Sequence, residues 1–278
     1  MTVLKKARRN VMCKILAFPH SSKIDQSHLN EMKNIITQYD PDGFGMSVMH
    51  NDGSFFDLKT LDIESELTFR KPLKLDGTIP LGFNSGQINL PESKAMILHG
   101  RMSTNEVSIE CTHPFKLDCG GSFIHNGVVS DLTNLTTLKT KCDTEILSTH
   151  WSSGARSFEN LATGYAAIAV LQKGLLHVAR DNSAMLYIAW SDEIESYIIA
   201  TTIEIIESLN YEISDINMIA PNTRLVFNGN KLESKHHFGI SVTYSSGMSK
   251  LASKALDRDI DFEAFDEFKN VKKWSHRK

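Results

Sequence analysis

The amino-acid sequence predicts an α+β fold in which antiparallel sheet predominates. Five apolar segments in the second half are short enough for strands and are separated by turn residues rather than helices: 164–171, 174–180, 185–190, 195–201 and 223–227. Strands joined by short turns pair in antiparallel fashion. Earlier in the chain, Asn51-Asp52-Gly53 divides two further strand-like segments, and an Asp-Gly step is typical of a tight hairpin.

The first elements follow from hydrophobic periodicity. Residues 13–18 are an apolar run, which predicts a short buried strand. Ser27 is expected to cap a helix that continues to about Tyr39. Its apolar face comprises Leu29, Met32, Ile35 and Ile36. The following Asp40-Pro41-Asp42-Gly43 predicts a turn.

The middle of the chain is less regular. Residues 45–56 predict the two strands of the hairpin, and residues 61–91 mix Lys, Pro and Gly, which indicates a helix fragment and a long loop. Segments 95–99 and 121–125 are expected to be strands that end near Arg101 and Asn126. A helical pattern begins at Asp143.

Three parts are expected along the chain. Residues 1–12 are basic and polar and are predicted to be a leader or propeptide, and residues 13–240 form the main domain. Residues 241–278 are predicted to form an amphipathic helix with a basic end. Its apolar positions are Leu256, Ile260, Phe265, Phe268 and Val271. This helix packs against its own domain or docks onto a partner.

Composition narrows the functional classes. A net charge of -3 offers no excess positive field for nucleic acid or an anionic membrane surface. No apolar run approaches the roughly 20 residues that span a bilayer, and no secretory signal is evident. Four cysteines in 278 residues are too sparse for a disulfide scaffold, so free thiols and a cytoplasmic location are expected. No nucleotide-binding motif is present.

Five motifs occur in a fixed order: Cys13, His99-Gly100-Arg101-Met102-Ser103-Thr104, Thr112-His113-Pro114-Phe115, His125-Asn126-Gly127 and Cys142-Asp143-Thr144-Glu145. Their order and spacing resemble the glutaminase domain of class II glutamine amidotransferases, the N-terminal-nucleophile type. The likeness includes Pro41-Asp42-Gly43-Phe44-Gly45, Arg180-Asp181 and Leu186, and it extends roughly from residue 13 to 230. It implies a four-layer αββα sandwich, with two antiparallel sheets between helical layers.

The resemblance implies that Cys13 is the nucleophile and that its own α-amino group is the base. An α-amino group has a pKa of about 7.7–8.0, so near neutrality it can take a thiol proton and later protonate ammonia. In the chain as written, the Cys13 nitrogen is held in an amide with Met12. Removal of residues 1–12, or translation from Met12 followed by loss of the methionine, would free it.

The other motifs take roles by the same resemblance. Arg101 would pair with the α-carboxylate of glutamine, Thr104 would hold its backbone, and Asp143 would bind its α-ammonium group. Asn126 and Gly127 would form the oxyanion hole. From the residues alone, Arg101 is equally a surface residue, Asn126-Gly127 a hairpin turn and Asp143 a helix N-cap.

Two positions depart from the family pattern. Lys14 stands where the family has glycine after the nucleophile, and Ala200-Thr201-Thr202 stands where many members have Ala-Ser-Glu. These departures keep open a catalytically silent binding or structural protein. A different N-terminal-cysteine amide hydrolase is a third possibility. A zinc site of Cys111, His113, Cys119 and His125 lacks the usual paired spacing.

We therefore expect a stand-alone glutaminase domain with glutamine as substrate and no cofactor or metal. The residues after the domain are too few for a synthase module, so a synthase or acceptor-binding protein would act in trans. A homo-oligomer is compatible with the sequence. No nucleic-acid or membrane partner is expected.

Overall fold

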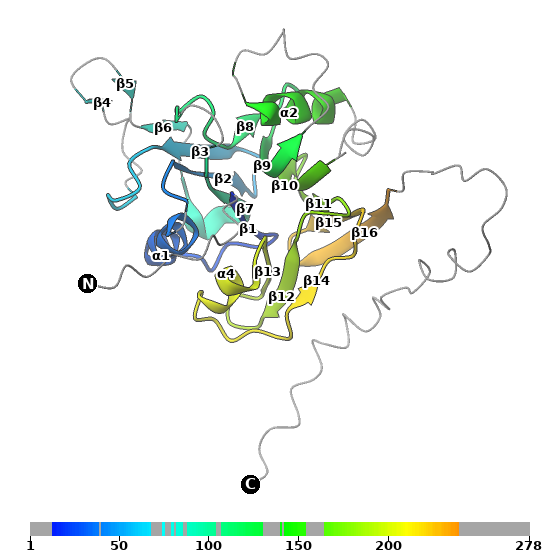
Figure 1. Ribbon diagram of the computed structural model, residues 1–278. Helices are drawn as coiled ribbons and strands as arrows, with labels where there is room; N and C mark the ends of the chain where they lie inside the picture. Colours follow the sequence, from blue (N-terminus) through cyan, green and yellow to red (C-terminus); the bar gives the residue numbers. More distant parts are fainter. Residues whose placement is uncertain are drawn as a thin grey trace, which may run out of the picture. The chain divides into compact units, whose positions relative to one another are not determined.

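The computed structural model describes residues 13–38, 40–67, 74–75, 79–80, 82–85, 88–103, 107–129, 140, 142–153 and 164–238. Two antiparallel sheets dominate these residues (Figure 1). The eight-stranded sheet has the order β14 (Asn217–Met218), β12 (Tyr187–Ser191), β13 (Ser196–Ala200), β1 (Lys14–Phe18), β7 (Ser93–Gly100), β2 (Phe44–His50), β3 (Phe55–Thr60) and β6 (Gly82–Ser85).

The six-stranded sheet has the order β16 (Lys231–His237), β15 (Thr223–Asn228), β11 (Leu175–Arg180), β10 (Gly164–Gln172), β9 (Ser122–Val129) and β8 (Phe115–Lys116). A separate pair is formed by β4 (Lys74–Leu75) and β5 (Ile79–Pro80). Every strand pair is antiparallel, for example Ala167 of β10 with Asn126 of β9 and Arg180 of β11. The predicted antiparallel sheet is confirmed.

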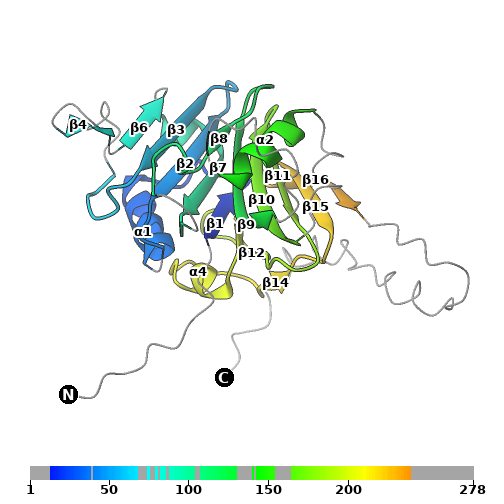
Figure 2. The same ribbon diagram turned by 45° about the horizontal axis from the view of Figure 1, so that its top comes forward.

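Helices cover the two outer faces, which gives the expected four layers (Figure 2). Helices α1 (Gln26–Thr37) and α4 (Ile203–Glu207) share one apolar cluster with the eight-stranded sheet. Helix α2 (Asp143–Ser153) buries Leu147 and Trp151 against Phe123 and Ile168 of the six-stranded sheet. The α+β sandwich implied by the resemblance is therefore the observed architecture.

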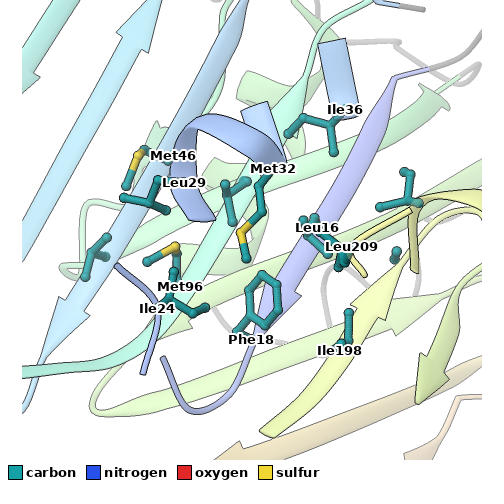
Figure 3. Packing of buried hydrophobic residues seen from close by; sticks show 14 of the residues in the cluster. Leu16, Phe18, Ile24, Leu29, Met32, Ile36, Met46, Met96, Ile198 and Leu209 are labelled. Atoms are coloured by element: carbon teal, nitrogen blue, oxygen red, sulfur yellow. The ribbon is translucent and has the colours of Figure 1, made fainter. Parts of the chain in front are cut away.

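The packing of α1 explains why the sequence forms this layer (Figure 3). Leu29, Met32 and Ile36 recur at helical spacing and are buried on one face. They pack against Leu16 and Phe18, alternate residues of β1. Since residues two apart in a strand share a face, Lys14 also points to the helical layer, whereas Cys13 and Ile15 belong to the face toward the other sheet.

The start of α1 differs from the expectation. Asp25, not Ser27, is the N-cap, and its carboxylate accepts hydrogen bonds from the backbone N-H groups of Ser27 and His28. The Ser27 hydroxyl donates to the same carboxylate. A carboxylate offers more acceptor sites than a hydroxyl, and its negative charge interacts favourably with the positive N-terminal end of the helix dipole. The aspartate is therefore the N-cap residue. The helix ends at Thr37, and Tyr39 lies outside the described residues.

The predicted hairpin and the five strands after residue 164 are confirmed, with Met49 pairing Phe55 across the turn. Residues 61–91 contain a short helix, η1 (Leu90–Glu92), but differ from the expectation because their described parts also include the strands β4, β5 and β6, of which β6 pairs with β3. The sequence reasoning also missed β14, β16 and α4. Residues 1–12 and 239–278 lie outside the description, so the leader and the C-terminal amphipathic helix stay predictions.

The inner faces of the two sheets contact each other through specific side chains. The Ser122 hydroxyl on β9 donates to Asp57 of β3 at 2.8 Å. Tyr197 on β13 packs against Phe227 of β15, with ring centroids 5.4 Å apart. Among the described helices, none is long and apolar enough to cross a membrane.

Candidate functional site

Cys13 immediately precedes β1, a central strand of the eight-stranded sheet. Register pairs Lys14 with Gly100, so Cys13 comes beside the residues that follow β7. Its Sγ accepts a hydrogen bond from the Met102 N-H at 3.3 Å and donates to the Met102 carbonyl at 3.4 Å. Burial raises the pKa of the Cys13 thiol to about 12. The thiol is therefore neutral near pH 7 and needs a base to become a nucleophile.

The unusual Lys14 points away from this thiol. Its ammonium group lies 3.9 Å from the buried carboxylate of Asp40, on the helical side of the sheet. Burial raises the pKa of Asp40 to about 7, against the opposing effect of Lys14. Because adjacent strand residues face opposite ways, the bulk of Lys14 does not obstruct the face that holds Cys13.

Arg101 is held by the turn that precedes β2. Its backbone N-H donates to the Gly43 carbonyl at 2.8 Å, and its own carbonyl accepts from the Asp42 N-H at 3.2 Å. The side chain is buried, and Nη1 donates to the Ser108 carbonyl at 3.1 Å. The guanidinium is thus oriented rather than solvated, which excludes the surface interpretation. Thr104 lies outside the described residues.

Asn126 and Gly127 lie inside β9, followed by Val128, so the hairpin interpretation is wrong. Asn126 is buried, and its Oδ1 has no hydrogen-bond partner among the described residues. Gly127 has a φ of +150°, and a Cβ at this position would lie 1.7 Å from the Tyr165 carbonyl oxygen. Only glycine fits here, because the neighbouring strand approaches too closely for a side chain.

Asp143 is the first residue of α2 and is half-buried. It therefore lies in the first turn of the helix rather than at the N-cap. Burial lowers the pKa of His125, and the Asp143 carboxylate opposes this shift. Such an effect requires that Asp143 lie near His125, which directly precedes Asn126.

Several observations show that the motif residues come together. After burial and the Met102 backbone, the groups that shift the pKa of Cys13 are Asp40, Arg101 and Cys142. The imidazole of His99, two residues before Arg101, donates from Nε2 to the carbonyl of His125 at 3.0 Å. This bond joins the two sheets beside Asn126. Four separate segments of the chain thus meet at one end of the sandwich.

The site contains contributors to which the sequence reasoning assigned no role. Asp181 is buried and accepts hydrogen bonds from the N-H groups of Ala166, Ser183 and Ala184. It ties the turn after β11 to Ala166, the partner of Gly127. The Arg180-Asp181 pair was visible as part of the resemblance, but its partners are set only by the fold.

Thr201 explains one of the departures from the family pattern. Its hydroxyl accepts a hydrogen bond from the Ile15 N-H at 3.1 Å, close to the start of β1. A serine hydroxyl accepts in the same way, so threonine preserves this contact. Thr202 caps α4 by accepting from the Ile205 N-H at 3.4 Å.

His113 and His125 both approach Thr144, but the zinc set is not assembled. Within the described ranges, no group of three or more His, Cys, Asp or Glu residues is arranged to hold a metal ion. Cys13, Cys111, Cys119 and Cys142 are all free thiols. The arrangement offers an oriented thiol, a buried guanidinium, a buried amide and a carboxylate.

No protein-family model matches the chain, and no curated protein sequence matches it significantly. Solved structures do match. The glutamine phosphoribosylpyrophosphate amidotransferase from B. subtilis, complexed with ADP and GMP, aligns with a TM-score of 0.58 at 16% identity, over 82% of this chain and 49% of that one. A structure described as the allosteric regulatory enzyme of purine biosynthesis aligns with a TM-score of 0.58 at 14% identity, over 84% and 50%.

A third match is a glutamine aminotransferase class-II domain protein from Silicibacter pomeroyi, with a TM-score of 0.45 at 13% identity, over 82% of this chain and 100% of that one. The chain spans about half the length of the first two proteins. The chain therefore shares the fold of the glutamine phosphoribosylpyrophosphate amidotransferase structure, a sandwich of two antiparallel sheets between helical layers.

Proposed function

We propose that this protein is a class II glutamine amidotransferase that hydrolyses the side-chain amide of free glutamine to glutamate and ammonia. The observation that carries the proposal is the meeting of Cys13, Arg101, Asn126 and Asp143, drawn from four segments, at one end of a sandwich with this fold. The ammonia is supplied to an acceptor.

Arg101 and Asp143 bind the two charges of the substrate. The guanidinium pairs with the α-carboxylate, and the carboxylate pairs with the α-ammonium group. A planar guanidinium suits a carboxylate because two parallel N-H groups can donate at once. This pair of contacts favours a free amino acid over a glutamine within a peptide, which lacks both terminal charges.

The reaction uses Cys13 twice. Its free α-amino group accepts the thiol proton while sulfur bonds to the amide carbon, and the carbonyl oxygen becomes an oxyanion. Asn126 and the Gly127 N-H stabilise that charge. The ammonium group then protonates the leaving nitrogen, which departs as ammonia and leaves a thioester. Water attacks the thioester, releases glutamate and restores the thiol.

The raised pKa of Cys13 makes the α-amino group essential to this scheme. A buried thiol with a pKa of about 12 forms almost no thiolate at pH 7, so a base must contact it. An amide nitrogen has no basic lone pair. The active form is therefore one whose chain begins at Cys13, produced by either route described above.

The experiment compares two forms of the protein, the full chain and one that begins at Cys13. We expect the second form to release glutamate from glutamine and the first to be silent. Cys13→Ala in the shorter form should abolish turnover. Arg101→Lys, which keeps the charge but loses the planar pair of donors, should raise KM for glutamine.

The readouts separate this proposal from its alternatives. A chain that begins at Cys13 and binds glutamine without turnover would contradict the enzymatic proposal and favour a silent binding protein. Turnover of another amide but not of glutamine would indicate a different N-terminal-cysteine amide hydrolase. Mass spectrometry of the trapped thioester on Cys13 would identify the nucleophile directly.

A further inference from the structure

Behind the candidate site lies a buried network of three histidines and one threonine. The rings of His99 and His113 stack with centroids 3.8 Å apart. Nε2 of His113 lies 3.0 Å from the Thr144 hydroxyl oxygen, and Nδ1 of His125 lies 3.3 Å from the same oxygen. All four residues are buried.

Burial keeps the three imidazoles neutral. It lowers the pKa of His99 to about 3 and also lowers the pKa values of His113 and His125. Each neutral ring has one N-H donor and one bare nitrogen acceptor. The Thr144 hydroxyl also lies near the Cys142 thiol, but its hydrogen-bond contacts of 3.0 and 3.3 Å are with the two imidazoles. It has a single proton, so it donates to one imidazole and accepts from the other.

The surroundings select one direction for these hydrogen bonds. His99 Nε2 faces the His125 carbonyl, which only accepts, so His99 carries its proton on Nε2. His125 Nε2 faces the Tyr165 carbonyl, although no linear hydrogen bond is completed. A proton on that nitrogen leaves Nδ1 of His125 bare, ready to accept from Thr144. Nε2 of His113 must then donate to Thr144.

This assignment agrees with the nitrogens that lack partners. Among the described residues, Nδ1 of His99, Nδ1 of His113 and Nε2 of His125 complete no hydrogen bond. In this arrangement the two Nδ1 atoms are bare acceptors, and the Nε2-H of His125 faces the Tyr165 carbonyl. The opposite direction would instead bury an unpaired N-H at His113 Nδ1 and set the bare Nε2 of His125 against the Tyr165 carbonyl. The network therefore runs from His113 through Thr144 to His125, with all three protons on Nε2.

We propose that Thr144 is a positioning residue, whose hydroxyl links the substrate-binding end of α2 to the oxyanion strand β9. The inference rests on the proposed function, because it concerns the same site. Thr144 follows Asp143, which is assigned to the α-ammonium group. The ring of His125, which precedes Asn126, is held by the same hydroxyl, and His99 holds the carbonyl of His125 from β7. One hydroxyl thus sets the separation between Asp143 and Asn126.

The test replaces the hydroxyl by a methyl group of similar size. In the form that begins at Cys13, Thr144→Val should lower kcat/KM by at least about 10-fold, and on the order of 100-fold if the shift reaches 1 Å. Both kinetic constants should change. KM should rise because the α-ammonium ligand Asp143 moves, and kcat should fall because the oxyanion-hole residue Asn126 moves. Thr144→Ser keeps the hydroxyl and should remain within about threefold of the unmodified chain.

Thr149 provides a matched control on the same helix. Its hydroxyl donates to the Glu145 carbonyl at 2.9 Å, and the residue is exposed. Thr149→Val makes the same chemical change with the same effect on helix propensity, at a hydroxyl that donates to a carbonyl of its own helix. We expect unchanged KM and kcat. If kcat/KM fell equally in Thr144→Val and Thr149→Val, the cause would be a general change in the helix, and the proposal would be overturned.

A second readout does not depend on catalysis. Long-range proton–nitrogen NMR correlations of the imidazoles in the full chain identify which ring nitrogen carries each proton. We expect Nε2-H for His99, His113 and His125, with the signals of His113 and His125 displaced in Thr144→Val and retained in Thr144→Ser. A proton on Nδ1 of His125 would overturn the assignment, whether or not Thr144→Val folds.

The two readouts separate failure of this inference from failure of the proposed function. The form that begins at Cys13 could fail to hydrolyse glutamine while NMR finds the predicted Nε2-H tautomers of the three histidines. That result would support the hydrogen-bond network and contradict the proposed function. If glutamine is hydrolysed and Thr144→Val, properly folded, retains both kinetic constants within twofold, the positioning role fails alone.

Discussion

At the scale of single residues, the site depends on positions where only one side chain fits. Gly127 is the clearest case, since its φ of +150° and the Tyr165 carbonyl at 1.7 Å from a would-be Cβ both exclude larger residues. Gly45 is similar, because a Cβ there would lie 1.7 Å from the His113 carbonyl oxygen. These two glycines let separate backbone segments approach where the motif residues meet.

We predict that Gly127→Ala destabilises the protein by more than about 3 kcal/mol, because both the backbone conformation and the contact are unfavourable. Gly53 is the control. It has a φ of +84°, but nothing lies within 4 Å of its would-be Cβ. Gly53→Ala should lower the free energy of unfolding by only about 1–2 kcal/mol, because the unfavourable φ of the backbone is its only cost. Urea denaturation measures both, and equal costs would refute the steric argument at Gly127.

At the scale of elements, the sequence pattern locates strands and helices more reliably than it identifies their terminal residues. The apolar face of α1 was predicted, but its cap was assigned to Ser27. Asp25 caps it instead, with the hydroxyl of Ser27 as an additional donor to the Asp25 carboxylate. The choice between two neighbouring capping residues depends on backbone geometry, which the residue types do not specify.

We predict that Asp25→Ala lowers the free energy of unfolding by about 1 kcal/mol, since two backbone N-H groups at the helix start lose their acceptor. Ser27→Ala should change it by less than about 0.5 kcal/mol, because the cap remains. Chemical denaturation of the two single variants distinguishes them. A larger effect at Ser27 would restore the original assignment.

At the scale of the whole molecule, the sandwich buries several ionisable groups between and behind its sheets. His99, His113 and His125 have lowered pKa values because of burial, whereas burial raises the pKa of Asp40 to about 7. A histidine whose folded pKa is lowered binds a proton more readily when unfolded. The stability that these neutral histidines contribute is therefore lost as pH falls below about 6.5.

We predict that the free energy of unfolding falls steeply between pH 6 and pH 5. Each buried histidine that gains a proton only on unfolding adds up to about 1.4 kcal/mol per pH unit to the slope. Asp40 opposes this, because its carboxyl is protonated in the folded state and ionised in the unfolded state, which reduces the slope by up to about 1.4 kcal/mol per pH unit. Asp40→Asn should restore the steeper slope. A pH-independent stability in this range would contradict neutral buried imidazoles.

The sequence by itself determined the antiparallel strand series, the amphipathic α1 and the order of the motifs, because periodicity and turn chemistry are local properties. Its resemblance to the class II glutamine amidotransferases also pointed to Cys13, Arg101, Asn126 and Asp143. It left open whether Lys14 blocks the thiol, since that depends on which face of β1 it occupies.

Only the tertiary structure decided these remaining questions. Lys14 turns toward Asp40 because β1 alternates between a helical layer and a facing sheet. Asn126-Gly127 continues β9 because β10 pairs with it over its length, although the same dipeptide suits a hairpin. His99, His113, His125 and Thr144 meet only when two sheets and a helix pack together. Contacts between residues far apart in sequence depend on packing, and local patterns do not encode them.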